Sequence, residues 1–306
     1  MAFIQYTMQI IIAFLMISMV SIMLPRASVS AVRVEEVLST GISIEDPENK
    51  KNFDENKKGI IEFKDVSFSY PNADEDVLSN VSFKANPGET TAFIGSTGSG
   101  KSTLINLIPR FYDITKGEIL VDGVNVKDVS QHDLREKIGY VPQKGVLFSG
   151  TIESNIKYGR EDATEEELAK AAEIAQATEF ITSKEEGFQT SISQGGTNVS
   201  GGQKQRLSIA RAIANNPEIY IFDDSFSALD FKTDATLRKA LKHETADSTV
   251  LIVAQRISTI LHADQIIVLE EGKVVGMGNH KELLNNCEVY KQIALSQLSK
   301  EELDNE

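Results

Sequence analysis

Residues 95–102, with the sequence GSTGSGKS, constrain the fold of this chain more than any other segment. They match the pattern G-x-x-x-x-G-K-[ST], between an apolar run at 91–94 and a helix-like stretch at 102–108. In a strand, loop and helix of this kind, glycines let backbone N–H groups curl around phosphate oxygens at the positive end of the helix. A flexible Gly/Ser linker is the alternative interpretation, but it needs no flanking strand and helix. We therefore predict a phosphate-binding loop in an α/β fold.

Two side chains of this loop have roles that the motif itself suggests. Lys101 would reach the β- and γ-phosphates of a nucleoside triphosphate, and the Ser102 hydroxyl would bind Mg²⁺. The expected ligands are therefore ATP and Mg²⁺. The other predicted ATP contacts come from the rest of the loop and the residue after it, namely Gly95, Ser96, Thr97, Gly98, Ser99, Gly100 and Thr103.

A second glycine-containing segment, SGGQ at residues 200–203, lies about a hundred residues downstream and precedes a predicted helix at about 204–215. Pro217 terminates that helix. The apolar run at 219–223 is typical of a buried strand, and it ends in Asp223, a carboxylate that could hold part of the Mg²⁺ shell. SGGQ alone could be a helix-capping loop, but after a phosphate loop and in this order it is a specific signal.

These motifs resemble, in the same order, the nucleotide-binding half of ATP-binding-cassette (ABC) transporters, specifically exporter half-transporters. The resemblance covers residues 60 to about 298. It implies an α/β P-loop NTPase with a RecA-like core, an antiparallel β subdomain and a helical signature subdomain. In this family two such domains dimerise head to tail. Each ATP then lies between the phosphate loop of one chain and the signature motif of the other.

The resemblance also assigns roles to residues outside the phosphate loop. Tyr70, in the sequence FSYP, resembles the aromatic residue that stacks on adenine, and Gln143, in YVPQ, resembles the sensor of Mg²⁺ and the γ-phosphate. The signature motif, which would contact the ATP of the partner, comprises Ser200, Gly201, Gly202 and Gln203. The loop that crosses the dimer comprises Ser227, Ala228, Leu229 and Asp230.

Two of the three candidate catalytic residues, Asp224 and Gln255, depart from the family pattern; Gln143 is the third. The family usually has glutamate after the Mg²⁺ aspartate, where it polarises the attacking water, whereas this chain has Asp224. Its carboxylate sits one methylene closer to the backbone, and a displacement of about 1 Å can cost roughly 10²-fold in rate. Gln255 stands where the family has a switch histidine before arginine; glutamine forms hydrogen bonds but cannot carry charge or move a proton.

Together the two departures match the degenerate-site half of heterodimeric ABC exporters. Because the assembly is head to tail, this chain's phosphate loop, Asp224 and Gln255 would build one site, and its intact signature motif would serve the other. The expected partner is a second half-transporter with competent Glu and His residues. The resemblance thus implies one slow, ATP-retaining site and one active site.

The N-terminal residues 1–24 are almost wholly apolar. Because about 20 helical residues cross a bilayer, we expect a transmembrane helix, and Arg26 and Arg33 place its C-terminal side in the cytoplasm. A signal peptide is the rival, but the basic n-region is missing. Exporter half-transporters have six membrane helices before the ATPase domain, and this segment resembles the last of them. We therefore expect the chain to be a fragment or the product of a truncated reading frame. The expected location is the cell membrane, with the ATPase domain on the cytoplasmic side.

The expected organisation has four parts. Residues 1–40 form the membrane helix and its cytoplasmic extension, 41–59 a polar linker, 60–300 the nucleotide-binding domain and 301–306 an acidic tail. Strands are predicted at 61–70, 81–85, 91–94, 118–121, 219–222, 249–254 and 265–269. Helices are predicted at 165–178, 204–215 and 281–298, with a mostly helical insertion at 151–216. His262 is expected on a surface turn, and Cys287 in the polar C-terminal helix.

Composition excludes two classes of protein. A net charge of −14 argues against a nucleic-acid-binding surface, and one cysteine in 306 residues allows no disulfide within the chain. Three functions remain: the energy-coupling subunit of a heterodimeric exporter, a soluble ABC ATPase of translation or DNA repair, and a regulatory ATP-binding module. The apolar N-terminus and the acidic charge favour the first over the second.

Overall fold

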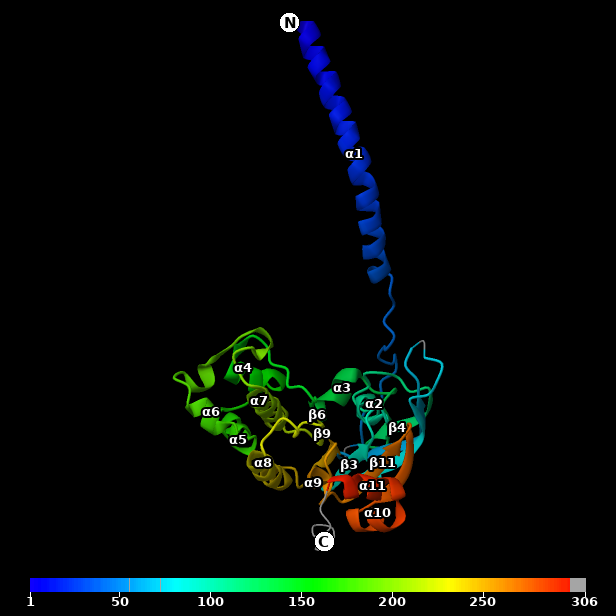
Figure 1. Ribbon diagram of the computed structural model, residues 1–306, viewed down its shortest axis with the longest axis vertical. Helices are drawn as coiled ribbons and strands as arrows, with labels where there is room; N and C mark the ends of the chain where they lie inside the picture. The colour runs from blue at the N-terminus through cyan, green and yellow to red at the C-terminus, as the bar shows by residue number, and fades with distance from the viewer. Residues whose placement is uncertain (55, 72, 298–306) are drawn as a thin grey trace. The chain divides into compact units, whose positions relative to one another are not determined.

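The computed structural model describes residues 1–54, 56–71 and 73–297 (Figure 1). The chain divides into two compact units, residues 1–45 and residues 46–306, which are described separately below. The predicted acidic tail at 301–306 and the last residue of the predicted C-terminal helix lie outside the described residues.

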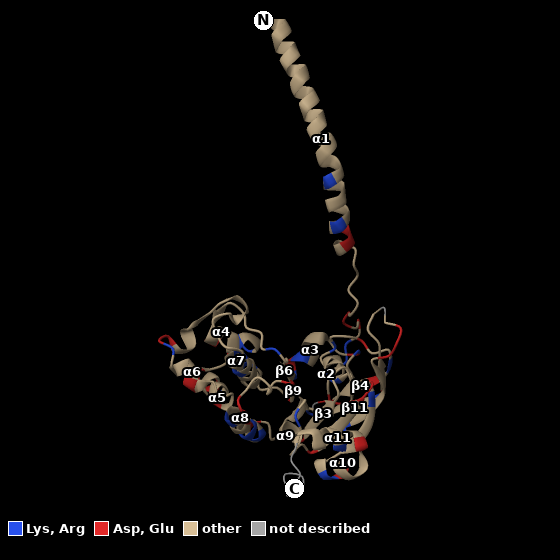
Figure 2. Cartoon of the chain, in the orientation of Figure 1, with Lys and Arg blue, Asp and Glu red and all other residues tan. Residues whose placement is uncertain are grey.

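The first unit consists mainly of one long helix, α1 (Ala2–Leu38). Its 37 residues, all described, include no buried residue, and their length of about 55 Å exceeds the ~30 Å of a bilayer's hydrocarbon core. By length and composition α1 could span a membrane. The helix continues through Pro25, and the charged residues lie towards the C-terminal end of α1 (Figure 2).

A mixed six-stranded sheet lies at the centre of the second unit, as far as the chain is described, in the order β12-β11-β3-β10-β9-β6. Every neighbouring pair is parallel except β11 and β12. The bounds are β3 (Thr90–Gly95), β6 (Ile138–Val141), β9 (Ile219–Asp223), β10 (Thr249–Val253), β11 (Gln265–Glu270) and β12 (Lys273–Gly278). The strands predicted at 219–222, 249–254 and 265–269 are present as β9, β10 and β11, whereas β6 and β12 were not predicted.

A second, antiparallel sheet has the order β2-β1-β4-β5 in the described part of the chain. Its strands are β1 (Ile61–Phe68), β2 (Leu78–Ala85), β4 (Lys116–Val121) and β5 (Val124–Asn125). Asp122 and Gly123 both have positive φ, at 52° and 81°, so they form a two-residue hairpin turn of the kind that suits strand twist. Asp122 is fully buried, and its Oδ1 accepts a hydrogen bond from the Ile60 N–H at 3.0 Å.

The predicted helical insertion is present between β6 and β9. It contains β7 (Gly150–Thr151), α4 (Ile152–Ile156), α5 (Glu165–Ile174), α6 (Thr178–Thr182), β8 (Ser191–Ile192) and α7 (Gly201–Ala214), with 3₁₀ turns at Lys157–Gly159, Gly187–Gln189 and Gln194–Gly196. The prediction of one helix over 165–178 is wrong, because Gln176 adopts φ 56° and separates α5 from α6. A capping box begins α5: the Thr164 hydroxyl accepts from the Glu167 N–H, and the Glu167 carboxylate accepts from the Thr164 N–H.

The remaining helices flank the central sheet: α2 (Lys101–Leu107), α3 (Gln131–Glu136), α8 (Phe231–Glu244), α9 (Ile257–Ile260), α10 (His280–Asn286) and α11 (Glu288–Gln297). The prediction of one C-terminal helix is wrong, because Cys287 has extended backbone angles between α10 and α11. Cys287 is buried against β12, where a side chain at Gly276 would approach the sulfur to 2.7 Å. His262 is exposed on a turn, as predicted.

Part of the polar segment after α1 is attached to the second unit. Asp46 Oδ1 accepts from the backbone N–H of Gln131 at 2.9 Å, and the Lys51 ammonium lies 2.7 Å from the Asp128 carboxylate. Asp46 and Lys51 are therefore part of the second unit. The predicted boundaries at 40 and 59 stay predictions.

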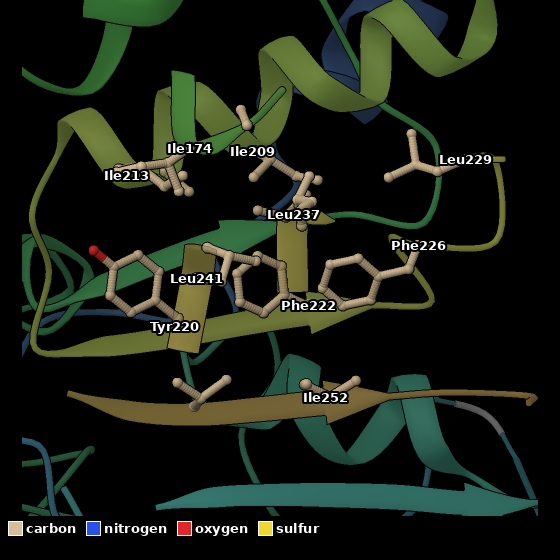
Figure 3. Close-up of a cluster of buried hydrophobic side chains, with 14 of the residues drawn as sticks. Ile174, Ile209, Ile213, Tyr220, Phe222, Phe226, Leu229, Leu237, Leu241 and Ile252 are labelled. Carbon is tan, nitrogen blue, oxygen red and sulfur yellow. The ribbon is translucent and has the colours of Figure 1, made fainter. Parts of the chain in front are cut away.

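Apolar packing fixes the central sheet against α7 and α8 (Figure 3). The labelled side chains are Ile174, Ile209, Ile213, Tyr220, Phe222, Phe226, Leu229, Leu237, Leu241 and Ile252. Phe222 is 1% exposed, with its ring centroid 5.3 Å from that of Phe226. Burying such a side chain stabilises the fold by about 1.5–3 kcal/mol. Because Asp223 and Asp224 directly follow Phe222 in the chain, this packing also fixes the end of β9, where the polar residues of the site lie.

Candidate nucleotide-binding site

The site is built at one edge of the parallel sheet. The strands β3, β6, β9 and β10 run in the same direction, so their carboxyl ends meet there. The phosphate loop follows β3, Gln143 follows β6, Asp223 ends β9 and Gln255 follows β10. These loops line a cavity of about 260 Å³, together with Val77, Lys101, Ser102, Thr103, Asp224 and Val253.

The phosphate loop holds its lysine in place with its own backbone. Lys101, 9% exposed, donates from Nζ to the carbonyl oxygens of Gly95 (2.9 Å) and Ser96 (2.7 Å) and to Ser99 Oγ (3.3 Å). Burial lowers the pKa of Lys101, and the nearby aspartates act against that shift. Glycine is required at position 95, where a Cβ would lie 2.0 Å from the Leu269 carbonyl oxygen. The predicted strand, loop and helix are therefore present.

Two of the three residues predicted to hold Mg²⁺, Ser102 and Asp223, are in direct contact. Ser102 Oγ donates to Asp223 Oδ1 at 2.9 Å, and Asp223 is 7% exposed, so burial raises its pKa. Within the described residues no three His, Cys, Asp or Glu side chains cluster as metal ligands. The hydroxyl of Ser102 and the carboxylate of Asp223 fit Mg²⁺, which takes one or two carboxylates and completes its shell with substrate phosphate oxygens and water. Ser102, Asp223 and Gln143 would hold the ion, and its charge would neutralise the phosphates.

The three candidate catalytic side chains meet at a single oxygen atom. Asp224 Oδ2 accepts from Gln143 Nε2 at 3.1 Å and from Gln255 Nε2 at 2.8 Å. Asp224 is half-buried, and its backbone has φ 45°, in the left-handed region that aspartate tolerates better than most residues. Burial raises the pKa of Asp224, while the hydrogen bond from Gln143 opposes that shift. The sequence predicted each residue, but not this contact.

Tyr70 lies beside the phosphate-loop helix instead of among the residues that line the described cavity. Its hydroxyl is 3.0 Å from Thr103 Oγ1, and its ring packs edge-on against Phe68 and Tyr112 at centroid distances of 4.9 and 5.2 Å. The ring is half-buried in this cluster. Stacking of adenine on Tyr70 stays a prediction.

The predicted signature motif begins α7. The Ser200 hydroxyl accepts from the Gln203 N–H at 3.3 Å, and Gln203 Oε1 accepts from the Ser200 N–H at 2.9 Å, which makes a capping box. Ser200 and Gly201 are exposed, and a Cβ at Gly201 would meet no described atom within 4 Å. Neither residue lines the cavity at this chain's own phosphate loop. The motif is therefore open for contact with another molecule.

The predicted dimer-crossing loop, residues 227–230, lies between Asp224 and α8 (Phe231–Glu244). Ser227 Oγ donates to the Asp224 carbonyl oxygen at 2.8 Å, and Leu229 is buried. Ala228 is exposed, and Asp230 caps α8 by accepting from the Thr233 N–H at 3.0 Å. The loop thus has three exposed residues, at 227, 228 and 230, around the buried Leu229.

Gln205 is a site residue that the sequence analysis missed. Its side chain, 1% exposed in α7, accepts from the Gly145 N–H at 2.9 Å and donates to the Pro142 carbonyl oxygen at 3.1 Å. These two bonds hold the loop that carries Gln143. No local pattern could have revealed this role, because the partners lie about 60 positions away.

Comparisons with known proteins agree with this geometry. The ABC transporter family profile matches residues 78–227. An uncharacterized ABC transporter ATP-binding protein of Mycobacterium tuberculosis is 47% identical over 299 residues, covering 97% of this chain and 51% of the relative. A putative multidrug export ATP-binding/permease protein of Staphylococcus aureus is 47% identical over 237 residues, covering 78% of this chain and 41% of the relative. The chain therefore spans about half the length of the curated relatives it matches.

A solved structure gives the same result for the fold. A bacterial Atm1-family ABC exporter with ATP bound superposes with a TM-score of 0.84 at 34% sequence identity, covering 90% of this chain and 48% of the exporter. The P-loop fold, the order of the motifs and these relatives lead to one assignment. The chain has the P-loop fold of ABC ATPases, and it is similar to ABC transporter ATP-binding proteins, exporters among them.

Proposed function

We propose that this chain is the ATP-binding subunit of a heterodimeric ABC exporter, with a degenerate site of its own that binds ATP and hydrolyses it slowly. The observation that carries this proposal is the double hydrogen bond to Asp224 Oδ2 from the amides of Gln143 and Gln255. Nucleotide binding needs the phosphate loop, Ser102 and Asp223, all of which are in place.

Slow turnover follows from the chemistry of that carboxylate. A general base needs a free lone pair directed at the attacking water, and a positioned base contributes about 10²–10⁴-fold in rate. In this chain two amide donors bind one oxygen of Asp224, and aspartate reaches one methylene less far than glutamate. Gln255 can neither accept nor release a proton at this position. Binding and cleavage are therefore separable.

The signature motif supports the second half of the proposal. Ser200 and Gly201 are exposed at the start of α7, where backbone N–H groups and the Ser200 side chain can face the γ-phosphate of an ATP held by a partner. Because this motif is intact, the partner's site would be competent if the partner has glutamate and histidine at the positions of Asp224 and Gln255. Hydrolysis there would power export.

The membrane assignment rests on α1 and its flanking charges. The helix is long and apolar enough to span a bilayer, and Arg26 and Arg33 lie on its C-terminal side, which the positive-inside bias places in the cytoplasm. The nucleotide-binding domain would then be cytoplasmic, where ATP is abundant. A soluble ABC ATPase is disfavoured by α1. A regulatory module with negligible turnover shares the Asp224 geometry, but it predicts no turnover even with a partner.

The test measures binding and hydrolysis separately on the full chain in lipid nanodiscs. We expect saturable MgATP binding, with steady-state phosphate release at least about 10²-fold below that of a competent cassette. Addition of the partner half-transporter should restore turnover. Rapid hydrolysis by the chain alone would contradict the degenerate-site assignment. Absence of turnover with every partner that forms a stable complex would favour the regulatory module.

A further inference from the structure

The last helix of the described chain reaches the switch loop at residues 255–257. Gln297, in the last turn of α11, donates from Nε2 to the Gln255 carbonyl oxygen at 2.9 Å and accepts at Oε1 from the Ile257 N–H at 2.8 Å. One side-chain amide thus spans the backbone on both sides of Arg256. The two bonds are of normal length and link segments 40 positions apart.

The Ile257 N–H needs such a partner. Ile257 is the first residue of α9, and the residue before it, Arg256, provides no side-chain cap. The first N–H groups of a helix have no partner inside the helix, so they require one from elsewhere. Gln297 supplies it from α11, whose own position is fixed by the fully buried Tyr290 and Ala294.

The other end of α9 is held independently. Arg238 of α8 donates to the carbonyl oxygens of Ser258 (2.9 Å) and Thr259 (3.3 Å), while two hydrogen bonds to Asp234 fix its guanidinium. Those hydrogen bonds from Arg238 go to Ser258 and Thr259, not to Gln255. Loss of Gln297 would therefore free residues 255–257 without releasing the rest of α9.

We propose that Gln297 is a positioning residue for the γ-phosphate end of the site. It fixes the backbone of residues 255–257, and so it directs the Gln255 side chain towards Asp224, which Gln255 contacts at 2.8 Å. The inference rests on the proposed function, because it takes Gln255 to face the γ-phosphate of bound ATP. A cavity of about 440 Å³ lies between α11, Gln255 and the start of the phosphate loop, so α11 faces both parts of the site.

The test compares nucleotides that differ at the γ-phosphate. The full chain in nanodiscs is titrated with the non-hydrolysable analogue AMP-PNP and with ADP, both with Mg²⁺, by displacement of a fluorescent nucleotide. Gln297→Ala should lower the preference for AMP-PNP over ADP about 3- to 10-fold, since one net hydrogen bond corresponds to roughly 2- to 12-fold in an equilibrium. The affinity for ADP should stay within about 2-fold.

Three further variants isolate the mechanism. Gln292→Ala removes an amide from the same helix and the same cavity lining, and it should change neither affinity. Gln297→Glu keeps the acceptor for the Ile257 N–H and should retain part of the preference. Gln255→Ala should lower the preference at least as much as Gln297→Ala does, and adding Gln297→Ala to it should have no further effect, because the two residues act through one contact.

Amide exchange provides a readout that is independent of nucleotide. Hydrogen exchange at Ile257 should accelerate in Gln297→Ala and remain slow in Gln292→Ala. Each of four results would overturn the proposal. They are unchanged amide exchange at Ile257 in Gln297→Ala, equal weakening of AMP-PNP and ADP binding, no effect of Gln255→Ala on the preference for AMP-PNP, and effects of Gln297→Ala and Gln255→Ala on that preference that add. The hydrolysis rate of the parent chain tests the degenerate-site assignment separately. Fast hydrolysis by the parent, together with the expected changes in nucleotide binding, would overturn that assignment and leave the role of Gln297 standing.

Discussion

The combined substitution Asp224→Glu and Gln255→His should raise ATP turnover by the full chain. In the parent, one oxygen of Asp224 accepts hydrogen bonds from Gln255 Nε2 at 2.8 Å and from Gln143 Nε2 at 3.1 Å. Glutamate extends the carboxylate by a C–C bond of about 1.5 Å. Histidine removes one of the two amide donors and supplies a ring nitrogen that can exchange a proton near neutral pH.

The expected gain can be estimated from this geometry. Because a misplacement of about 1 Å costs roughly 10²-fold, Asp224→Glu alone should recover up to about 10² in rate, equivalent to about 2.7 kcal/mol of the barrier. Gln255→His alone should gain less, because the aspartate remains short. The double variant should exceed both single variants, and the gains should not multiply, since both act on one water molecule and one γ-phosphate.

The assay is phosphate release by the full chain in nanodiscs at saturating MgATP. The double variant combined with Lys101→Ala serves as the blank for contaminating ATPases. Melting temperatures measured in parallel would show whether any variant is only less stable. A double variant no faster than the parent, at unchanged melting temperature and nucleotide affinity, would refute the argument that Asp224 and Gln255 limit turnover.

Three further predictions concern single residues. Lys101→Ala removes the ammonium that the loop holds at its centre, so fluorescent-nucleotide binding should be lost or weakened severely. Gly95→Ala should lower the melting temperature and abolish binding, because its Cβ would lie 2.0 Å from the Leu269 carbonyl oxygen; unchanged melting and binding would contradict this. The Arg160 guanidinium is the main group that lowers the pKa of Glu167 to about 2. The parent should therefore melt at a higher temperature than Glu167→Gln. This difference in melting temperature should be full above about pH 4.5 and disappear as the pH falls towards 2.

Much of the fold followed from apolar runs and from the motifs between them. The strands β9, β10 and β11 are continuous apolar segments buried on both faces, and such segments are readable without an alignment. β6 has four residues, one of them Gly139, and β12 alternates exposed and half-buried residues, so neither gave a strong signal. The break at Cys287 has no Gly or Pro to mark it, and contact with β12 decides its conformation.

The site was predictable as a set of residues but not as an arrangement. The phosphate loop and its neighbours are local motifs, whereas the bonds of Gln205 and Gln297 join segments 40 or more positions apart. The contact of both amides with a single oxygen of Asp224 depends on where three strands end in the folded sheet. Such geometry is set by tertiary packing, and periodicity and spacing carry no information about it.

The proposed asymmetry between the phosphate loop and the signature motif can be tested directly by one comparison in the proposed heterodimer. Co-purified with its partner half-transporter, the chain would carry either Ser200→Ala or Asp224→Asn, with melting temperature and ATPase rate measured side by side. Removing a donor to transition-state charge costs roughly 10²–10³ in rate, so Ser200→Ala should nearly silence the complex, while Asp224→Asn should leave most of its activity. Equal loss of activity in the two variants, at unchanged melting temperature, would contradict the asymmetric assignment.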